Sequence, residues 1–206
     1  MAQIVAAMAS VHSPLMTMAP HMADQPTWQR IHQGFDTLKK TLTDNKVDTI
    51  VVISDEHFNA LDPRRYPSFG VVTSTTAVGP VENWLGMPSN SIKINCASDL
   101  AEAVMSEGMQ QGFDLTRLGE VGLDHGFLTA LNFLTPQWDL SYLWLIQNCV
   151  LPPLPSLKRI HGSYKNLFTM LQPVTIEDGR TEFEVTAYGE QKKVQYRENL
   201  VVKKAA

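Results

Sequence analysis

Short apolar runs without polar alternation recur along the chain. The clearest are Gln3–Met8, Thr49–Ser54 and Leu140–Gln147, and further candidates are Phe69–Thr73 and Ile92–Asn95. Runs of this length and character are typical of strands that are covered on both faces of a sheet. The pattern therefore predicts a buried central sheet, mostly parallel or mixed.

A helical repeat separates the first two runs. After Asp24 and Pro26, which mark a helix start, apolar residues recur at steps of three and four. These residues are Trp28, Ile31, Phe35, Leu38 and Leu42. Strand, helix and strand in this order predict a right-handed βαβ unit in a parallel sheet.

Three more helices are expected, one beginning near Ser98, one over Phe127–Leu134 and one over Leu157–Leu171. Because helices alternate with buried strands, the expected fold class is α/β, with three layers in which helices cover both faces of the central sheet. A loop rich in Gly, Pro and Asn occupies residues 77–91. A loop of that length in a compact domain tends to be functional.

The length of 206 residues fits a single domain. After the proline-rich bend at 151–156, and past Gln172, polar and apolar residues alternate around a Gly-containing turn, which predicts a hairpin exposed on one face. We expect an α/β catalytic-type domain over residues 1–171. A divergent C-terminal hairpin and tail over residues 172–206 is expected to pack on the same domain.

Composition argues against several functional classes. The net charge of -4 gives no reason to expect nucleic acid, which needs concentrated Lys and Arg. No apolar run approaches the ~20 residues that span a bilayer, so no membrane segment is expected. The apolar N-terminus has no basic region before it, which favours a buried strand over a signal peptide. Cys96 and Cys149 have no paired spacing, and a reducing cytoplasm is the expected location.

Three of the six histidines occupy special positions. His12, His57 and His125 each lie just past a predicted strand or at the mouth of a helix, where open α/β sheets form their ligand crevice. Three separate loops can thus bring three imidazoles together. The alternative is three capping or packing histidines. His32 and His161, next to inward-facing helix positions, are expected to be surface or packing residues.

Asp55 and Glu56 stand beside His57 at the end of a predicted buried strand. A site with two histidines and one carboxylate that leaves coordination positions open suits non-heme Fe(II). The same donors also permit a Zn²⁺ hydrolase that uses an activated water. Consumption of oxygen separates these two chemistries.

Three loops carry a family resemblance. The segments "SVHSPLM", "EHFNA" and "LDHGFLTALNFL" stand in this order, each with the expected strand before it. At these loops the sequence resembles the class III extradiol ring-cleavage dioxygenases, the group of 2,3-dihydroxyphenylpropionate dioxygenases and protocatechuate 4,5-dioxygenase catalytic subunits. The similarity covers roughly residues 1–165. It implies that His12 and His57 are iron ligands and that His125 transfers protons.

The resemblance implies cleavage of a catechol by O2 with Fe(II) as cofactor. Glu56 stands where the family usually has Asp, and with Asp55 it is expected to orient and neutralise the metal site. Asn59 and Asp124 are candidates for binding the second hydroxyl of the substrate. A homo-oligomer is expected, with a companion subunit as a further possibility.

The sequence departs from the family after the proline-rich bend. Family members carry there a Gly-rich segment ending in Ser-His and then a glutamate that completes the metal triad, and neither is recognisable, so the chain resembles a member shortened at its C-terminus. The third ligand stays open between another chain and the carboxylates of Asp55, Glu56, Asp124, Glu177, Asp178, Glu182 and Glu184. The alternative to an enzyme is a non-catalytic structural or regulatory relative that has lost part of the site.

Overall fold

The computed structural model of the chain describes residues 4–171, 181–187 and 190–196. Within them, the central sheet has four strands in the order β1-β6-β2-β5. They are β1 (Thr49–Ser54), β6 (Ser141–Gln147), β2 (Phe69–Val72) and β5 (Thr116–Leu118). The sheet is mixed, because β6 runs parallel to β1 and antiparallel to β2, whereas β2 and β5 are parallel.

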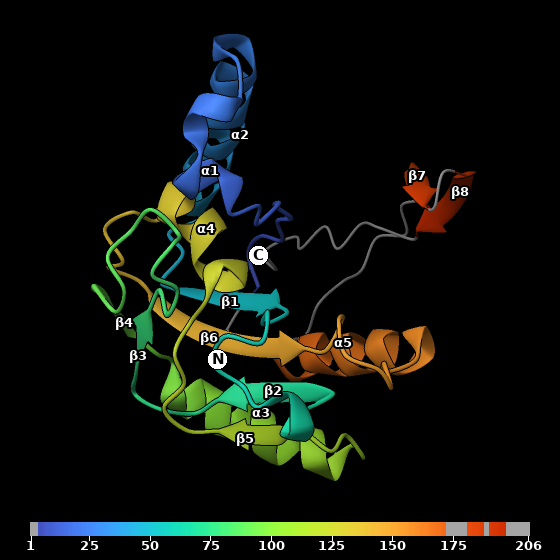
Figure 1. Ribbon diagram of the computed structural model, residues 1–206. Coiled ribbons are helices and arrows are strands. Elements are labelled where there is room, and N and C mark those ends of the chain that lie inside the picture. The colour runs from blue at the N-terminus through green and yellow to red at the C-terminus, as the bar shows by residue number, and fades with distance from the viewer. Residues whose placement is uncertain (1–3, 172–180, 188–189, 197–206) are drawn as a thin grey trace.

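Helices cover both faces of this sheet (Figure 1). One face carries α4 (His125–Leu134), and α2 (Gln25–Asp44) packs on α4; the other carries α3 (Ser98–Gln110) and α5 (Leu157–Leu171). Successive side chains of β6 point to opposite faces of the sheet. Trp144 packs in the cluster with α4, and Leu143 packs in the cluster with α3. The predicted three-layer α/β fold is confirmed.

Smaller elements complete the chain. β3 (Thr76–Gly79) pairs antiparallel with β4 (Ile92–Asn95), and β7 (Thr181–Ala187) pairs antiparallel with β8 (Glu190–Tyr196). The remaining elements are short helices: α1 (Leu15–Met18), η1 (Pro20–Met22) and η2 (Pro63–Arg65). The predicted hairpin is thus present, whereas its packing on the first domain and the boundary at residue 172 stay predictions.

The prediction of a strand over Gln3–Met8 is wrong for the residues that the structure describes. Gln3 lies outside the described residues, and residues 4–8 form no strand. Ile4 nevertheless packs against the cluster on the α3 face of the sheet. The apolar character of this run therefore reflects side-chain burial without ladder hydrogen bonds. The predicted βαβ unit does not form, and the parallel neighbour of β1 is β6, far along the chain.

Two short strands differ from the sequence prediction. Residues predicted to begin the loop 77–91 belong to β3, and β5 was not predicted. β5 has only three residues, of which Thr116 and Arg117 are exposed, so it lacks the apolar run that identifies a buried strand.

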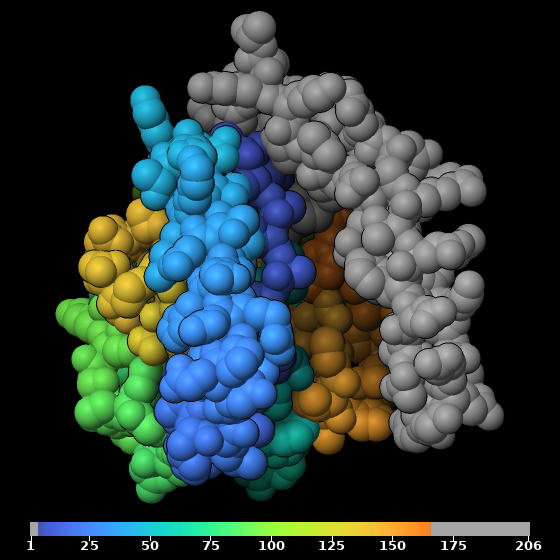
Figure 2. Space-filling model, turned by 90° about the horizontal axis from the view of Figure 1, so that it is seen from above, coloured from blue at the N-terminus to red at the C-terminus, as the bar shows by residue number. Residues whose placement is uncertain are grey.

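The helix α2 is held by its start and by one aromatic contact. The Asp24 carboxylate accepts a hydrogen bond from the Thr27 amide at 2.8 Å, which caps the helix as predicted. Phe35, only 5% exposed, stacks on Phe133 of α4 with ring centroids 5.2 Å apart. Seen from above, α2 lies beside the yellow-coloured α4 on this face of the molecule (Figure 2).

We predict that Phe35→Ala lowers the free energy of unfolding by about 3–5 kcal/mol, because it removes a buried aromatic ring and leaves a cavity against α4. Urea denaturation followed by circular dichroism measures the change. Gln33→Ala, at an exposed position of the same helix, should change stability by less than about 0.5 kcal/mol. Equal effects of the two substitutions would contradict this account of how α2 is attached.

Candidate active site

The structure brings the three predicted histidines together. His57 follows the end of β1, His125 is the first residue of α4, and His12 comes from the loop before α1. The ring centroids of His57 and His125 are 4.2 Å apart, and those of His12 lie 5.2 Å from His57 and 6.2 Å from His125. The convergence expected from the three loops is therefore present.

The close approach of His57 and His125 depends on Gly126. A Cβ atom at this position would lie 2.5 Å from the Asp55 carbonyl oxygen and 2.9 Å from the Cε1 atom of His57. Cβ atoms in proteins essentially never lie this close to other atoms, so a larger residue at this position would force the two segments apart. The Ser54 hydroxyl also donates to the Gly126 carbonyl at 2.7 Å, so the end of β1 and the start of α4 are joined directly.

Glu56 holds the loop that carries His57. Its buried carboxylate accepts hydrogen bonds from the backbone amides of Phe58 at 3.0 Å, of Ala60 at 2.6 Å, and of Asn59. These bonds support Phe58 in a left-handed conformation with φ of 61°. The Tyr66 hydroxyl donates to the Glu56 carbonyl. Burial raises the pKa of Glu56, and the amide hydrogen bonds oppose that rise.

Asp124 orients His57 and caps α4. One carboxylate oxygen accepts from the Gly126 amide at 3.0 Å, which satisfies the helix N-terminus. The other accepts from the His57 backbone amide at 2.7 Å and lies 3.2 Å from the His57 Nδ1 atom. This contact holds the ring with Nδ1 toward Asp124, and Nε2 faces Asp55. A carboxylate that fixes a ring in this way is a common support for a metal-binding histidine.

Glu82 is the site residue that the sequence prediction missed. Its Oε1 atom accepts from the backbone amide of His125 at 2.9 Å and lies 2.7 Å from the His125 Nδ1 atom. Its Oε2 atom is buried and has no hydrogen-bond partner within the described part of the chain. Glu82 lies in the loop 77–91 that was expected to be functional, but its partner is 43 positions away in sequence.

Asn59, which was predicted to bind substrate, joins two of these carboxylates. Its side-chain amide donates to Glu82 at 3.2 Å and to Asp124 at 3.2 Å. The networks around His57 and His125 are therefore one connected set of hydrogen bonds. A role for Asn59 or Asp124 in substrate binding stays a prediction.

His12, Asp55 and His57 form a group that can hold a metal ion. The Nε2 atom of His12 lies 3.9 Å from one oxygen of Asp55, and the Nε2 atom of His57 lies 3.6 Å from the other. One donor atom from each residue falls within 4.8 Å of the others. Burial lowers the pKa of His12, although Asp55 opposes this, which favours the neutral imidazole that binds metals.

A second group of possible donors, His57, Asp124 and His125, is better described as a hydrogen-bond network. The His125 Nδ1 atom is engaged by Glu82, and the Asp124 oxygens accept from backbone amides. Few lone pairs remain there for a metal.

The charges around the histidines are unbalanced. Asp55, Glu56, Glu82 and Asp124 surround them, and among the described residues none of these carboxylates forms an ion pair with Lys or Arg. Negative charge in a partly buried site is costly without a positive partner. The site therefore suits a cation.

One exposed aromatic side chain lies beside the histidines. The Trp84 ring is 5.5 Å from the His125 ring and is 44% exposed. Its indole can therefore contact a planar organic molecule next to His125.

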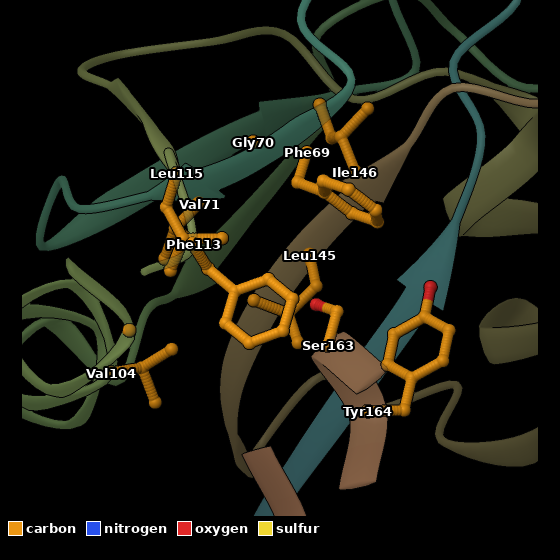
Figure 3. A pocket seen from close by; sticks show the side chains of 11 residues that line it. Phe69, Gly70, Val71, Val104, Phe113, Leu115, Leu145, Ile146, Ser163 and Tyr164 are labelled. Carbon is orange, nitrogen blue, oxygen red and sulfur yellow. The ribbon is translucent and has the colours of Figure 1, made fainter. Parts of the chain in front are cut away.

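A separate apolar pocket lies between the sheet and the α3–α5 layer (Figure 3). Phe69, Phe113, Leu145 and Tyr164 are among the side chains that line it. Among the residues that the structure describes, no histidine or carboxylate lines this pocket, so it lacks the donor set of the histidine site.

Comparison with known proteins places the chain in a family. Residues 6–162 match the family described as the catalytic LigB subunit of aromatic ring-opening dioxygenase. The chain belongs to this family. The resemblance to ring-cleavage dioxygenases found in the three histidine loops is thereby confirmed.

Curated relatives of this LigB-family chain bear a common name, 2,3-dihydroxyphenylpropionate/2,3-dihydroxicinnamic acid 1,2-dioxygenase. The protein of Photorhabdus laumondii subsp. laumondii is 27% identical over 150 residues, which are 72% of this chain and 44% of the relative. The protein of Rhodococcus sp is 27% identical over 157 residues, 76% of this chain and 48% of the relative. The chain thus spans less than half of the length of these relatives.

Among solved structures, a putative methylthioadenosine nucleosidase from Weissella paramesenteroides overlaps with 66% of this chain and 74% of its own. Its TM-score is 0.42 at 12% identity, and this overlap has no bearing on the activity of the LigB-family chain. Within the described residues, no helix has both the length and the apolar character needed to cross a bilayer.

We predict that Glu82→Ala lowers the free energy of unfolding by about 2–4 kcal/mol, because two buried N–H groups of His125 lose their acceptor. Glu82→Gln keeps an acceptor oxygen and should lose roughly half of this or less. Urea denaturation of the metal-free proteins measures both changes. Equal stability of the parent and Glu82→Ala would show that the Glu82–His125 contact does not hold α4 in place.

Proposed function

We propose that this chain carries the centre of an aromatic ring-opening dioxygenase that uses non-heme Fe(II) and cleaves a catechol beside its diol, the extradiol mode. The observation that supports this most is the meeting of His12, His57 and a carboxylate, with His125 stacked beside them, in a member of the LigB family. The names of the relatives point to catechols that carry an acidic side chain as the first substrates to test.

The residues present fit iron. Two imidazoles whose Nε2 atoms face a carboxylate are the donor set that binds Fe(II) while leaving positions open for other molecules. The uncompensated negative charge of the site also favours a divalent cation. Bound Fe(II) would supply the redox chemistry with O2 and a point of attachment for the two catechol oxygens.

His125 is assigned the acid–base role. Glu82 occupies its Nδ1 atom, so Nε2 is the atom that can accept or give a proton. The ring is 4.2 Å from the ring of a proposed ligand, His57, and so lies next to the residues that would hold the metal. Glu82 keeps the ring in one orientation while the proton moves.

Trp84 is the proposed contact for the aromatic ring of the substrate. Its indole lies within reach of the His125 ring and is exposed toward solvent, so a planar molecule can pack against it. A homo-oligomer, a companion subunit and a cytoplasmic location stay predictions.

The experiment combines metal analysis with oxygen uptake. After anaerobic loading, the parent is expected to hold one Fe(II) per chain and to consume O2 with 2,3-dihydroxyphenylpropionate, giving a coloured ring-opened product. His12→Ala and His57→Ala should lose the iron. His125→Gln should keep it, while turnover falls by about 100-fold or more. His161→Ala changes an exposed histidine of α5 and serves as the control.

Iron retained in full by His57→Ala would remove this residue from the centre. Bound metal without oxygen uptake would favour a hydrolase. A parent that binds no iron would favour the non-catalytic alternative.

A further inference from the structure

We infer that the carboxylate of Asp55 is the third metal ligand, so that this chain assembles a complete two-histidine, one-carboxylate centre from its first 57 residues. This inference rests on the proposed metal site but not on turnover. The sequence left the third ligand open between seven carboxylates and another chain, and this inference selects one of the seven.

Position supports Asp55 first. Among the described residues, Asp55 is the one carboxylate that shares a group of possible donors with both His12 and His57. Its two oxygens face different rings, one toward each Nε2 atom, at 3.9 and 3.6 Å. Its side chain is 12% exposed, so it faces the interior of the site and not bulk water.

The other carboxylates of the site are occupied. Glu56 accepts three amides of its own loop, and Asp124 accepts from the start of α4 and from His57. Glu82 accepts from His125, and neither of its oxygens belongs to a donor group with His12. Asp55, in contrast, has the two imidazoles as its polar partners within the described part of the chain.

The orientation of the His57 ring supplies a second geometric argument. Its Nδ1 atom lies 3.2 Å from an Asp124 oxygen, so Nε2 is the ring nitrogen that faces the Asp55 oxygen, at 3.6 Å. Asp124 thus turns a possible donor atom of His57 toward a possible donor atom of Asp55.

Local geometry explains how one loop provides two ligands. Asp55 and His57 are two positions apart just past the end of β1, and possible donor atoms of both lie within 4.8 Å of each other. The hydrogen bonds of Glu56, the residue between them, turn its own side chain into the loop. The metal then needs only His12 from elsewhere.

Four of the carboxylates that the sequence offers as a third ligand have no described side chain. Glu177 and Asp178 lie outside the described residues, and Glu182 and Glu184 belong to β7, for which only the backbone is described. The experiment therefore has to measure the contribution of Asp55 directly.

The test is an anaerobic titration of the metal-free full chain with Fe(II), in which isothermal calorimetry measures the binding constant. Asp55→Asn keeps the shape of the side chain but removes its charge, and it should weaken Fe(II) binding by more than about 100-fold, beyond the effect of losing a support residue. Asp36→Asn, which removes an equal charge from the surface of α2, serves as the control. It should bind Fe(II) within about threefold of the parent.

The outcomes separate this inference from the proposed function. If Asp55→Asn binds iron as tightly as the parent while His57→Ala does not, the metal site stands and Asp55 is not a ligand. If the parent binds no iron, both the metal site and the role of Asp55 are overturned.

A crystal structure of the iron-loaded parent avoids any dependence on how the variants fold. An Asp55 oxygen bonded to the metal, at roughly 2.2 Å, would support the inference. Iron bound by His12 and His57 with another carboxylate in that place would overturn it.

Discussion

The carboxylate of Asp124 is the interaction on which the site depends. One oxygen caps the first turn of α4, and the other holds the backbone and ring of His57. A single side chain thereby fixes the helix that begins with His125 relative to the strand end that carries His57. Since the carboxylate is fully buried, these hydrogen bonds operate without competition from water. Asp124 therefore joins the two segments that carry these histidines.

Four carboxylates of similar chemistry have different tasks because their hydrogen-bond partners differ. Glu56 stabilises a strained loop, Asp124 joins β1 to α4, and Glu82 fixes the ring of His125. Of these four, Asp55 is the one that faces both His12 and His57. An acidic residue near a histidine therefore says little about its role until the direction of its oxygens is known.

The sequence predicted the elements that carry long periodic patterns. The helix around Phe35, the strand before Asp55 and the strand Leu140–Gln147 are present, as is the convergence of the three histidine loops. The sequence was a poorer guide to which segments are strands. Residues 4–8 are apolar but pair with no strand, and β5 is too short and too polar to show a strand pattern. Glu82 escaped because its partner is remote in sequence, and nothing in a loop sequence indicates which buried donor a carboxylate will meet.

The absence of a side chain at Gly126 determines how the two stacked histidines relate to each other. Only a hydrogen atom separates the backbone of α4 from the carbonyl of Asp55 and the ring of His57. The distance between a proposed metal ligand and a proposed proton carrier is thus limited by a van der Waals radius and not by an adjustable side-chain conformation. A centre built this way keeps its spacing when distant parts of the chain change, and a single added methyl group would widen it.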